Sequence, residues 1–188
     1  MNTLYPIFLK LDQLELLIVG GGAVGHEKLS AVLKNSPEAK VNLVAPEIRK
    51  EVEELATDYP TVKLHYREFQ WEDLNGKHLV ILATDKRELH EEIKKVTAEK
   101  HLLTNVADTP DLCDFYLSSV VQKGDLKIGI STNGKSPTLA KRIREYLEEA
   151  LPDEVQELMD NLQVFRSKLK DDFAHKVKAL NDLTKKVF

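Results

Sequence analysis

Hydrophobic positions along the chain form two repeating patterns. Continuous apolar runs of strand length occur at residues 16–19, 41–45, 78–83 and 102–106, and residues 62–66 alternate as a strand does. Between these runs, hydrophobic residues recur three and four positions apart, which is the spacing of one helix face. Strands that alternate with helices predict an α/β protein with a parallel sheet covered on both faces.

Two further elements are expected from the same pattern. Ile7, Leu9 and Leu11 alternate with other residues and predict a short edge strand that leads into the run at 16–19. Pro46 is expected to begin the element after the second run, because proline suits the first turn of a helix. The edge strand is expected to be scaffold rather than part of a site.

From Asp114 onward the pattern changes from crossovers to a hairpin. Strands expected at residues 117–121 and 126–130 flank Lys123-Gly124-Asp125, a sequence typical of a tight turn. Ser136 is then placed to cap a helix, since a serine side chain can accept a backbone N–H of the first turn. The expected elements are therefore a hairpin followed by a capped helix.

These patterns divide the chain into three expected parts. A parallel sheet with its helices occupies residues 1–113, and a small α+β segment of hairpin and helix occupies residues 114–151. A helical tail occupies residues 152–188, where hydrophobic residues keep a looser helical spacing. We expect the tail to serve packing or a dimer surface rather than chemistry.

A glycine motif follows the first apolar run directly. Gly20, Gly22 and Gly25 form a GxGxxG between an expected strand and an expected helix. In such a turn the first glycine permits the bend, the second lets a pyrophosphate approach, and the third packs the helix against its strand. The unpaired amides at the helix start face the anion. The motif predicts a dinucleotide site on a Rossmann-like parallel sheet.

The end of the second run bears on the choice of cofactor. Ala45-Pro46 stands where an acidic residue usually binds the ribose 2′-hydroxyl, and Glu47 is the nearest substitute. No Arg or Lys stands immediately there to favour a 2′-phosphate, so NAD is the expected cofactor. The expected cofactor-binding residues in these two stretches are Gly20, Gly21, Gly22, Ala23, Val24, Gly25, Pro46 and Glu47.

Composition narrows the classes of function. The 27 Lys and Arg against 31 Asp and Glu give a net charge of −4, so no overall basic surface indicates nucleic acid. No apolar run approaches membrane-spanning length, and the N-terminus lacks the pattern of a secretion signal. Cys113 is the only cysteine, and CxxC and HExxH are absent, so neither a disulfide nor a metal site is expected. We expect a cytoplasmic protein without nucleic-acid or membrane partners.

One segment departs from the acidic balance of the chain. Residues 117–144 contain six basic residues and a single acid, Asp125, which gives this segment a charge near +5. Charge alone favours an ordinary solvated face. The capped helix start at Ser136 nevertheless adds a second place suited to an anion.

Five short stretches follow one another with characteristic spacing. They are Pro6-Ile7-Phe8, Val19-Gly20-Gly21-Gly22-Ala23-Val24, Ala83-Thr84-Asp85, Asn105-Val106-Ala107-Asp108 and Ser131-Thr132-Asn133-Gly134-Lys135-Ser136-Pro137. Together, over about residues 4–150, they resemble the precorrin-2 dehydrogenase/sirohydrochlorin ferrochelatase family. The resemblance implies NAD-dependent oxidation of precorrin-2 to sirohydrochlorin in siroheme biosynthesis, with ferrous insertion as a second activity in some members. Within these 188 residues, we do not expect the methyltransferase domain that is fused to some siroheme synthases.

The resemblance also implies site residues and partners. Asp108 is implied as the catalytic base, and Thr84 and Asp85 join the cofactor-binding residues. A homodimer is implied, in which the middle segment exchanges contacts between the subunits. Fe²⁺ is implied only as a substrate, and Ser136 is implied as a residue that can be phosphorylated. The implied substrate-binding residues are Asn105, Ser131, Asn133, Gly134, Lys135, Ser136 and Arg142.

The residues themselves support part of this assignment. Asp108 follows the run at residues 102–106, at the edge where parallel strands end and a dinucleotide binds. A carboxylate there can accept the proton that leaves the macrocycle when a hydride is removed. The simpler interpretation is that Asp108 shapes the turn at Thr109-Pro110. Lys135 and Arg142 suit a substrate with many carboxylates.

Two other classes of function stay open. A regulatory nucleotide-binding module, such as the ligand-sensing domain of a potassium transporter, shares the glycine turn, but such modules usually end the second strand in Asp rather than Ala45. Another small NAD(P) oxidoreductase is the third class, and detection of a tetrapyrrole product separates it. Tyr59 and Lys63 form a YxxxK, but Pro60 denies the helix that would align them.

Overall fold

The computed structural model describes residues 2–168 and 173–185. The chain divides into two compact units, the first ending at Ser118 and the second beginning at Ser119. Residues 114–118 group with the first unit because Asp114 and Phe115 are hydrogen-bonded to its last strand. The division expected after residue 113 therefore lies a short way inside this unit.

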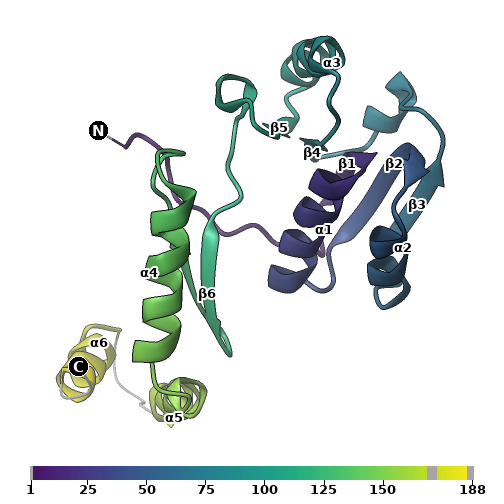
Figure 1. The fold of residues 1–188 in the computed structure, drawn as a ribbon. Coiled ribbons are helices and arrows are strands. Elements are labelled where there is room, and N and C mark those ends of the chain that lie inside the picture. The colour runs from purple at the N-terminus through teal and green to yellow at the C-terminus, as the bar shows by residue number, and fades with distance from the viewer. Residues whose placement is uncertain (1, 169–172, 186–188) are drawn as a thin grey trace. The chain divides into compact units, whose positions relative to one another are not determined.

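A five-stranded parallel sheet forms the centre of the first unit (Figure 1). Its order is β3-β2-β1-β4-β5, and every neighbouring pair is parallel. The strands are β1 (Glu15–Gly21), β2 (Lys40–Ile48), β3 (Val62–Tyr66), β4 (Leu79–Leu82) and β5 (Leu103–Val106). This confirms the predicted Rossmann-like α/β class.

Helices cover both faces of this sheet, as the sequence pattern predicts. The helices are α1 (Ala23–Asn35), α2 (Lys50–Thr57) and α3 (Arg87–Glu99), with short 3-10 helices η1 (Trp71–Leu74) and η2 (Pro110–Leu112). Alternate residues of β1 point to opposite faces. Ile18 packs in the core cluster with Leu29 of α1 and Val52 of α2, whereas Val19 packs in the cluster that contains Ile93 of α3.

Two scaffold expectations are wrong. Residues 2–10 form no strand, and Ile7 and Phe8 have 57% and 71% of their surface exposed. Alternation makes a strand only beside a strand that offers hydrogen bonds, and β1 is already flanked by β2 and β4. Pro46 lies inside β2 rather than at the start of a helix. The pairing with β1 shifts register there, so no ladder N–H is required of the proline.

The second unit contains a hairpin and three helices. Strands β6 (Ser119–Lys123) and β7 (Leu126–Ile130) are antiparallel, followed by α4 (Pro137–Ala150), α5 (Val155–Lys168) and α6 (Phe173–Thr184). Gly124 makes the turn with a φ of 57°. The side chain of Ser136 accepts the backbone N–H of Leu139 at 3.2 Å, which confirms the predicted cap of α4.

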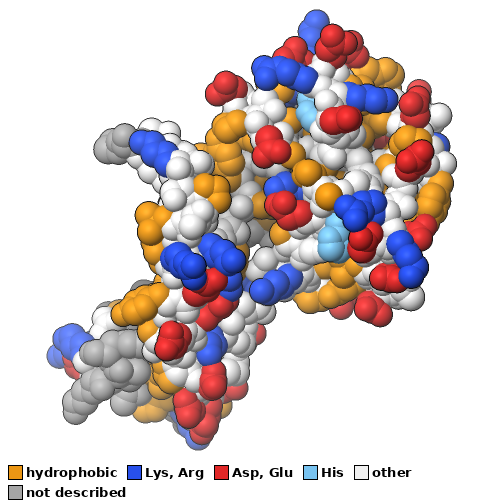
Figure 2. All heavy atoms as spheres, viewed as in Figure 1, with side chains coloured by type: hydrophobic (Ala, Val, Ile, Leu, Met, Phe, Trp, Pro, Cys, Tyr) orange, Lys and Arg blue, Asp and Glu red, His pale blue; other side chains and the backbone are white. Residues whose placement is uncertain are grey.

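The surface of the described residues carries mixed charge. Figure 2 shows acidic and basic side chains interspersed over the visible face of the sheet-containing unit. Oppositely charged side chains pair along helices of both units, as Arg87 does with Glu91 in the first unit and Arg144 with Glu148 in the second. Among residues 2–168 and 173–185, no helix combines the length and the apolar character needed to cross a membrane.

Candidate active site

The carboxyl ends of four adjacent strands bring the expected cofactor residues to one edge of the sheet. Pro46 and Glu47 stand at the end of β2, the glycine turn follows β1, Thr84 follows β4 and Asp108 follows β5. The strand order reverses direction between β1 and β4. Ligands of open α/β sheets bind outside such a switch point. The fold therefore places these residues at the carboxyl edge of the sheet, on both sides of the switch point.

Close packing explains two of the motif glycines. Gly20 has a φ of 118°, and a Cβ there would lie 2.4 Å from the carbonyl oxygen of Ala83. A Cβ on Gly25 would lie 2.1 Å from the carbonyl oxygen of Gly20. Both contacts are far below van der Waals separation. A side chain at Gly20 would push the turn away from the end of β4, and one at Gly25 would push α1 away from β1.

Gly22 differs from its neighbours because it faces open space. A Cβ on Gly22 would meet no atom within 4 Å. Gly22 is the N-cap of α1, it offers no side-chain cap, and the first turn of the helix contains no acidic residue. The helix-start amides and the space before them suit the pyrophosphate of a dinucleotide.

Thr84 is oriented by a buried histidine. Its hydroxyl oxygen lies 2.7 Å from Nε2 of His90 and accepts the backbone N–H of Lys86 at 3.3 Å. His90, on the first turn of α3, is 4% exposed. Burial lowers the pKa of His90, against an opposing effect of Asp85, so the imidazole is neutral at neutral pH. His90 was not among the predicted site residues, although its spacing from Ile93 and Thr97 marks a buried helix face.

Asp108 is exposed at the top of the turn after β5. Its φ is 55°, and the backbone N–H of Thr109 closes the turn onto the carbonyl of Val106 at 3.3 Å. Asp and Asn tolerate this left-handed conformation better than most residues. Thr109, not Asp108, is the N-cap of η2, and no side chain caps that helix. The carboxylate is therefore exposed at the carboxyl edge of the sheet.

The residues after η2 line the outer edge of β5 and close this loop. Sγ of Cys113 accepts the N–H of Val106 and lies 3.2 Å from the Val106 carbonyl, to which it can donate. Asp114 accepts the N–H of Thr104 at 2.9 Å and donates its own N–H to the Thr104 carbonyl at 2.7 Å. Burial raises the pKa of the Cys113 thiol, which suits a structural rather than a reactive cysteine.

Asn105 has a structural contact in this loop. Its side-chain amide donates to the carbonyl of Phe115 at 2.8 Å, and the residue is 6% exposed. The substrate role implied for Asn105 stays a prediction, and the amide already serves to tie the loop to β5.

The other implied substrate residues lie in the second unit, around the start of α4. Asn133 and Gly134 have φ of 54° and 74°, and Thr132 bonds both backbone groups of Ser136 at 3.1 Å. Ser131 accepts the N–H of Asn133 at 3.2 Å. Lys135 is part of this loop, whereas Arg142 lies further along α4 and pairs with Glu145 at 2.9 Å.

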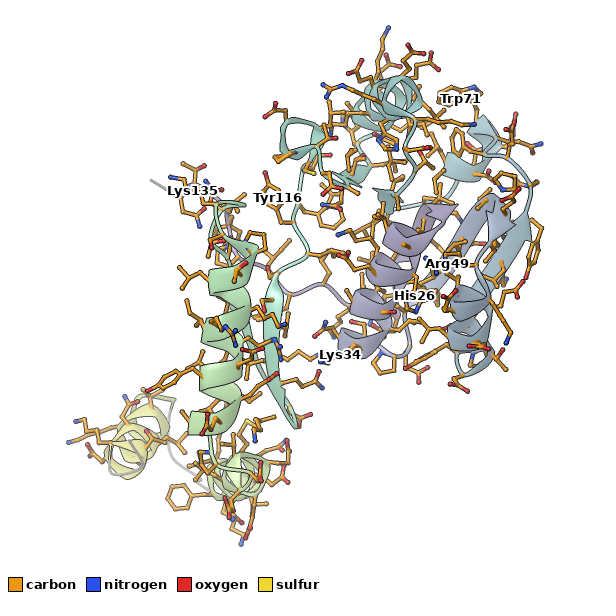
Figure 3. All side chains as sticks on the ribbon, viewed as in Figure 1. His26, Lys34, Arg49, Trp71, Tyr116 and Lys135 are labelled. Carbon is orange, nitrogen blue, oxygen red and sulfur yellow. The ribbon has the colours of Figure 1, made fainter. Side chains whose placement is uncertain are left out.

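Arg49 lies at the carboxyl edge of the sheet, beside the glycine turn, and was not among the residues predicted to bind the cofactor. Its backbone N–H donates to the carbonyl of Gly21 at 3.0 Å. Its guanidinium group binds both carboxylate oxygens of Glu51, at 2.7 and 3.2 Å. Figure 3 labels Arg49 and His26, which both act electrostatically on Glu51. Sequence could have found it as the first cation after the second strand.

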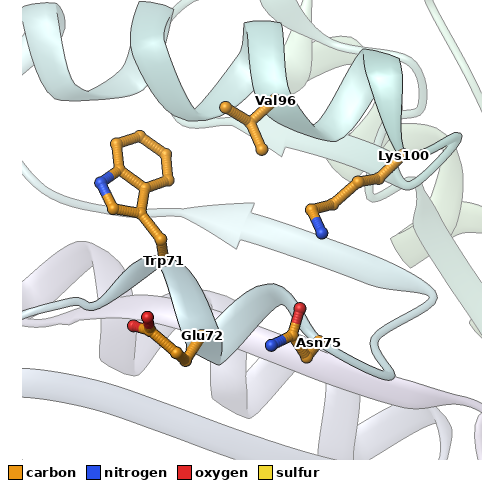
Figure 4. Close-up of a pocket in the computed structure, with 5 residues that line it drawn as sticks. All are labelled: Trp71, Glu72, Asn75, Val96 and Lys100. Atoms are coloured by element: carbon orange, nitrogen blue, oxygen red, sulfur yellow. The ribbon is translucent and has the colours of Figure 1, made fainter.

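One further pocket lies away from this edge. A cavity of about 280 Å³ is lined by Trp71, Glu72, Asn75, Val96 and Lys100 (Figure 4). These residues come from η1 and the end of α3, which precede β4 and β5, so the cavity is at the amino ends of those strands. No group of three His, Cys, Asp or Glu side chains that could hold a metal ion occurs in the described parts of the chain.

Two known families match stretches of the chain. Residues 7–119 match the family described as putative NAD(P)-binding, and residues 123–150 match the family described as sirohaem biosynthesis protein central. The siroheme synthase of Pseudoalteromonas translucida (strain TAC 125) is 36% identical over 170 residues, which are 90% of this chain and 35% of the relative. That of Ruthia magnifica subsp. Calyptogena magnifica is 34% identical over 93% of this chain and 36% of the relative.

A solved structure shares the fold. The protein named SirC, precorrin-2 dehydrogenase, superposes with a TM-score of 0.76 at 23% identity, covering 96% of this chain and 89% of that one. The chain spans about a third of the length of the siroheme synthases that it matches. The family matches confirm the resemblance indicated by the five stretches and give a nicotinamide dinucleotide as the cofactor class. The chain therefore belongs to the putative NAD(P)-binding family, and the matched region is followed in the sequence by a segment that matches the sirohaem biosynthesis protein central family.

Proposed function

We propose that this chain catalyses the NAD-dependent dehydrogenation of precorrin-2 to sirohydrochlorin in siroheme biosynthesis. The observation that carries the proposal is an exposed carboxylate, Asp108, on the same edge of one sheet as the open glycine turn. The names of the relatives, siroheme synthase and precorrin-2 dehydrogenase, support this substrate class.

Different residues bind the cofactor and accept the proton. When bound, the nicotinamide cofactor accepts a hydride from the macrocycle. The open face of Gly22 and the amides of α1 hold the pyrophosphate. Removal of a hydride leaves a proton to be taken up, and the Asp108 carboxylate is the general base that accepts it. The Cys113 thiol and the Thr109 amide hold the backbone of its turn.

We propose NAD rather than NADP as the cofactor. Glu47 is exposed at the end of β2, where it can accept a ribose hydroxyl. The Arg49 guanidinium, the cation nearest to that position in the chain, is occupied by Glu51. A 2′-phosphate bound there would be repelled by the carboxylates of Glu47 and Glu51, while the guanidinium group of Arg49 is already paired.

For the substrate, we propose that the loop at residues 131–136 and the start of α4 bind the peripheral carboxylates of the ring. The segment is basic, and the capped helix start favours anions. Lys135 supplies a cation within the loop, and Arg142 can exchange its half-exposed partner Glu145 for a substrate carboxylate.

We further propose that the chain works as a homodimer built on the second unit. Leu139, Ile143 and Tyr146 form an exposed stripe on α4, with 53%, 36% and 69% of their surface accessible. A two-stranded sheet with one helix is marginal on its own, and a second copy would cover this stripe.

Ferrous insertion is a weaker second activity in this proposal. Insertion requires the pyrrole nitrogens to lose protons, so the same base, Asp108, can serve both steps with Fe²⁺ as substrate. Anaerobic addition of Fe²⁺ to sirohydrochlorin, measured against the spontaneous rate, tests this step separately. A rate enhancement that survives in Asp108→Ala would contradict the shared base.

The main test is an anaerobic assay with precorrin-2 and NAD, followed by absorbance of the tetrapyrrole product. Asp108→Asn should lower kcat about 10²-fold or more, the usual scale for loss of a general base. Its affinity for NAD, measured by calorimetry, should stay unchanged, because asparagine keeps the left-handed turn.

Asp111→Asn is the matched control for this test. Asp111 is an exposed acid of the same loop, in η2, and its change should leave kcat near that of the wild type. A nearly normal rate in Asp108→Asn would reduce Asp108 to a turn residue. NAD binding without any tetrapyrrole product would instead favour a regulatory module.

A further inference from the structure

We propose that the Arg49–Glu51 ion pair sets which nicotinamide dinucleotide this chain binds. Glu51 holds the Arg49 guanidinium and keeps it from a 2′-phosphate, so that NAD binds better than NADP. The inference rests on the proposed dinucleotide site and adds an account of how that site distinguishes NAD from NADP.

The backbone places Arg49 directly against the glycine turn. The N–H of Arg49 donates to the carbonyl of Gly21 at 3.0 Å. A Cβ on Gly21 would lie 2.7 Å from the carbonyl oxygen of Glu47 and 3.0 Å from Cα of Ile48. The chain from the end of β2 to Arg49 therefore packs on the turn that receives the pyrophosphate.

This is the position at which dinucleotide-binding sheets distinguish the two cofactors. An acid at the end of the second strand accepts the ribose 2′-hydroxyl of NAD, and an arginine nearby accommodates the 2′-phosphate of NADP. Here the strand ends in Ala45-Pro46-Glu47, and Arg49 is the N-cap residue of α2. An acid and an arginine are both present, so the contacts of Arg49 bear directly on the expected preference for NAD.

The side-chain contacts decide in favour of NAD. Nη2 and Nε of Arg49 bind Oε1 and Oε2 of Glu51 at 2.7 and 3.2 Å, which occupies one fork of the guanidinium group. The hydrogen bond from a backbone N–H, and then the side chain of Arg49, lower the pKa of Glu51, so this carboxylate is ionised at neutral pH. The first turn of α2 stabilises that negative charge further.

A 2′-phosphate at this position would have to displace Glu51 and then remain beside it. It would also face Glu47, whereas a 2′-hydroxyl meets no such repulsion and can donate to Glu47. Neutralising Glu51 should therefore release the guanidinium fork for a phosphate and remove one repulsive charge.

The experiment compares the two cofactors on the full chain. Calorimetry of wild type and Glu51→Gln with NAD and with NADP should show that Glu51→Gln tightens NADP about 5-fold, the scale of one half-exposed ion pair, and changes NAD less than 2-fold. Adding Arg49→Ala to Glu51→Gln should abolish the gain.

Glu54→Gln is the matched control. Glu54 lies on the same helix and pairs with Lys50 at 3.0 Å, so its change removes the same charge without touching Arg49. An equal gain of NADP affinity in Glu54→Gln would overturn the inference, as would a wild type that prefers NADP. If wild type binds NAD and only the variants fail to differ, the proposed function stands and the ion pair has no such role. If wild type binds neither dinucleotide, the proposed function itself fails.

Discussion

At the scale of single residues, glycine is required at the positions of the motif for different physical reasons. Gly20 and Gly25 are fixed by packing within the protein, because a Cβ on either would overlap a backbone carbonyl. Gly22 has no such constraint, and its Cβ position is empty within 4 Å. A substitution at Gly22 can therefore test ligand binding without testing the fold.

Gly22→Asp should abolish dinucleotide binding and leave the protein folded. Aspartate is a favoured N-cap residue and has room here, so α1 should not be destabilised. Its carboxylate would, however, occupy the place of the pyrophosphate and repel it. Calorimetry gives the affinity, and a thermal melt checks the fold.

Two further variants are compared with Gly22→Asp. Gly22→Ala should fold and bind more weakly, because it adds bulk without charge. Gly25→Ala should lower the melting temperature, because its Cβ would lie 2.1 Å from the carbonyl oxygen of Gly20. Unchanged NAD affinity in a folded Gly22→Asp protein would remove the dinucleotide site from the glycine turn.

At the scale of elements, α3 and the end of β4 are joined by a partly buried polar contact. His90 near the start of α3 lies 2.7 Å from the hydroxyl of Thr84, which follows β4 at the cofactor edge. Burial lowers the pKa of His90, so the folded protein resists its protonation more than the unfolded chain does. Stability is then linked to pH through this group.

Acid should weaken the fold through His90. Well above pH 6.5, the ordinary pKa of histidine, neither state carries the proton and the contact contributes fully. As the pH falls below that value, the unfolded chain gains a proton that the folded state refuses, so the free energy of unfolding falls, at most by about 1.4 kcal/mol per pH unit. Urea unfolding between pH 7.5 and 5.5 measures this loss.

His90→Gln should flatten this pH dependence, because glutamine keeps a polar group near Thr84 but does not titrate. His101→Asn is the control: His101 is exposed, and asparagine tolerates its φ of 57°. The interpretation is contradicted if His90→Gln loses as much stability on acidification as the wild type does.

At the scale of the whole molecule, the exposed stripe of α4 bears on assembly. Leu139, Ile143 and Tyr146 are three and four positions apart, which places them on one helix face, while Ala140 of the same helix is buried. An apolar stripe of this kind indicates an interaction surface. The proposed homodimer would bury it.

Light scattering at micromolar concentration should give twice the 21.4 kDa mass of the chain. Ile143→Glu should shift the protein toward a monomer, because burying a carboxylate in an apolar interface is costly. Lys141→Glu places the same carboxylate on the opposite, exposed side of α4 and should leave the mass unchanged. A wild-type monomer with full activity would refute the dimer.

Local patterns were sufficient for most elements of the fold. The apolar runs and helical spacings predicted all five strands of the parallel sheet, and turn chemistry predicted the hairpin at Gly124 and the cap at Ser136. The placement of Asp108 beyond the last strand followed from the same argument. These features are determined by sequence alone because each depends on residues within a few positions of one another.

Only the tertiary structure decided which distant residues become neighbours. It gave the strand order β3-β2-β1-β4-β5, kept Pro46 inside β2, and denied a strand to residues 2–10. It also brought His90 to Thr84 and Arg49 to Gly21. A hydrogen bond or an ion pair across the fold depends on how the sheet is ordered and how each helix packs, and no periodicity along the chain encodes either.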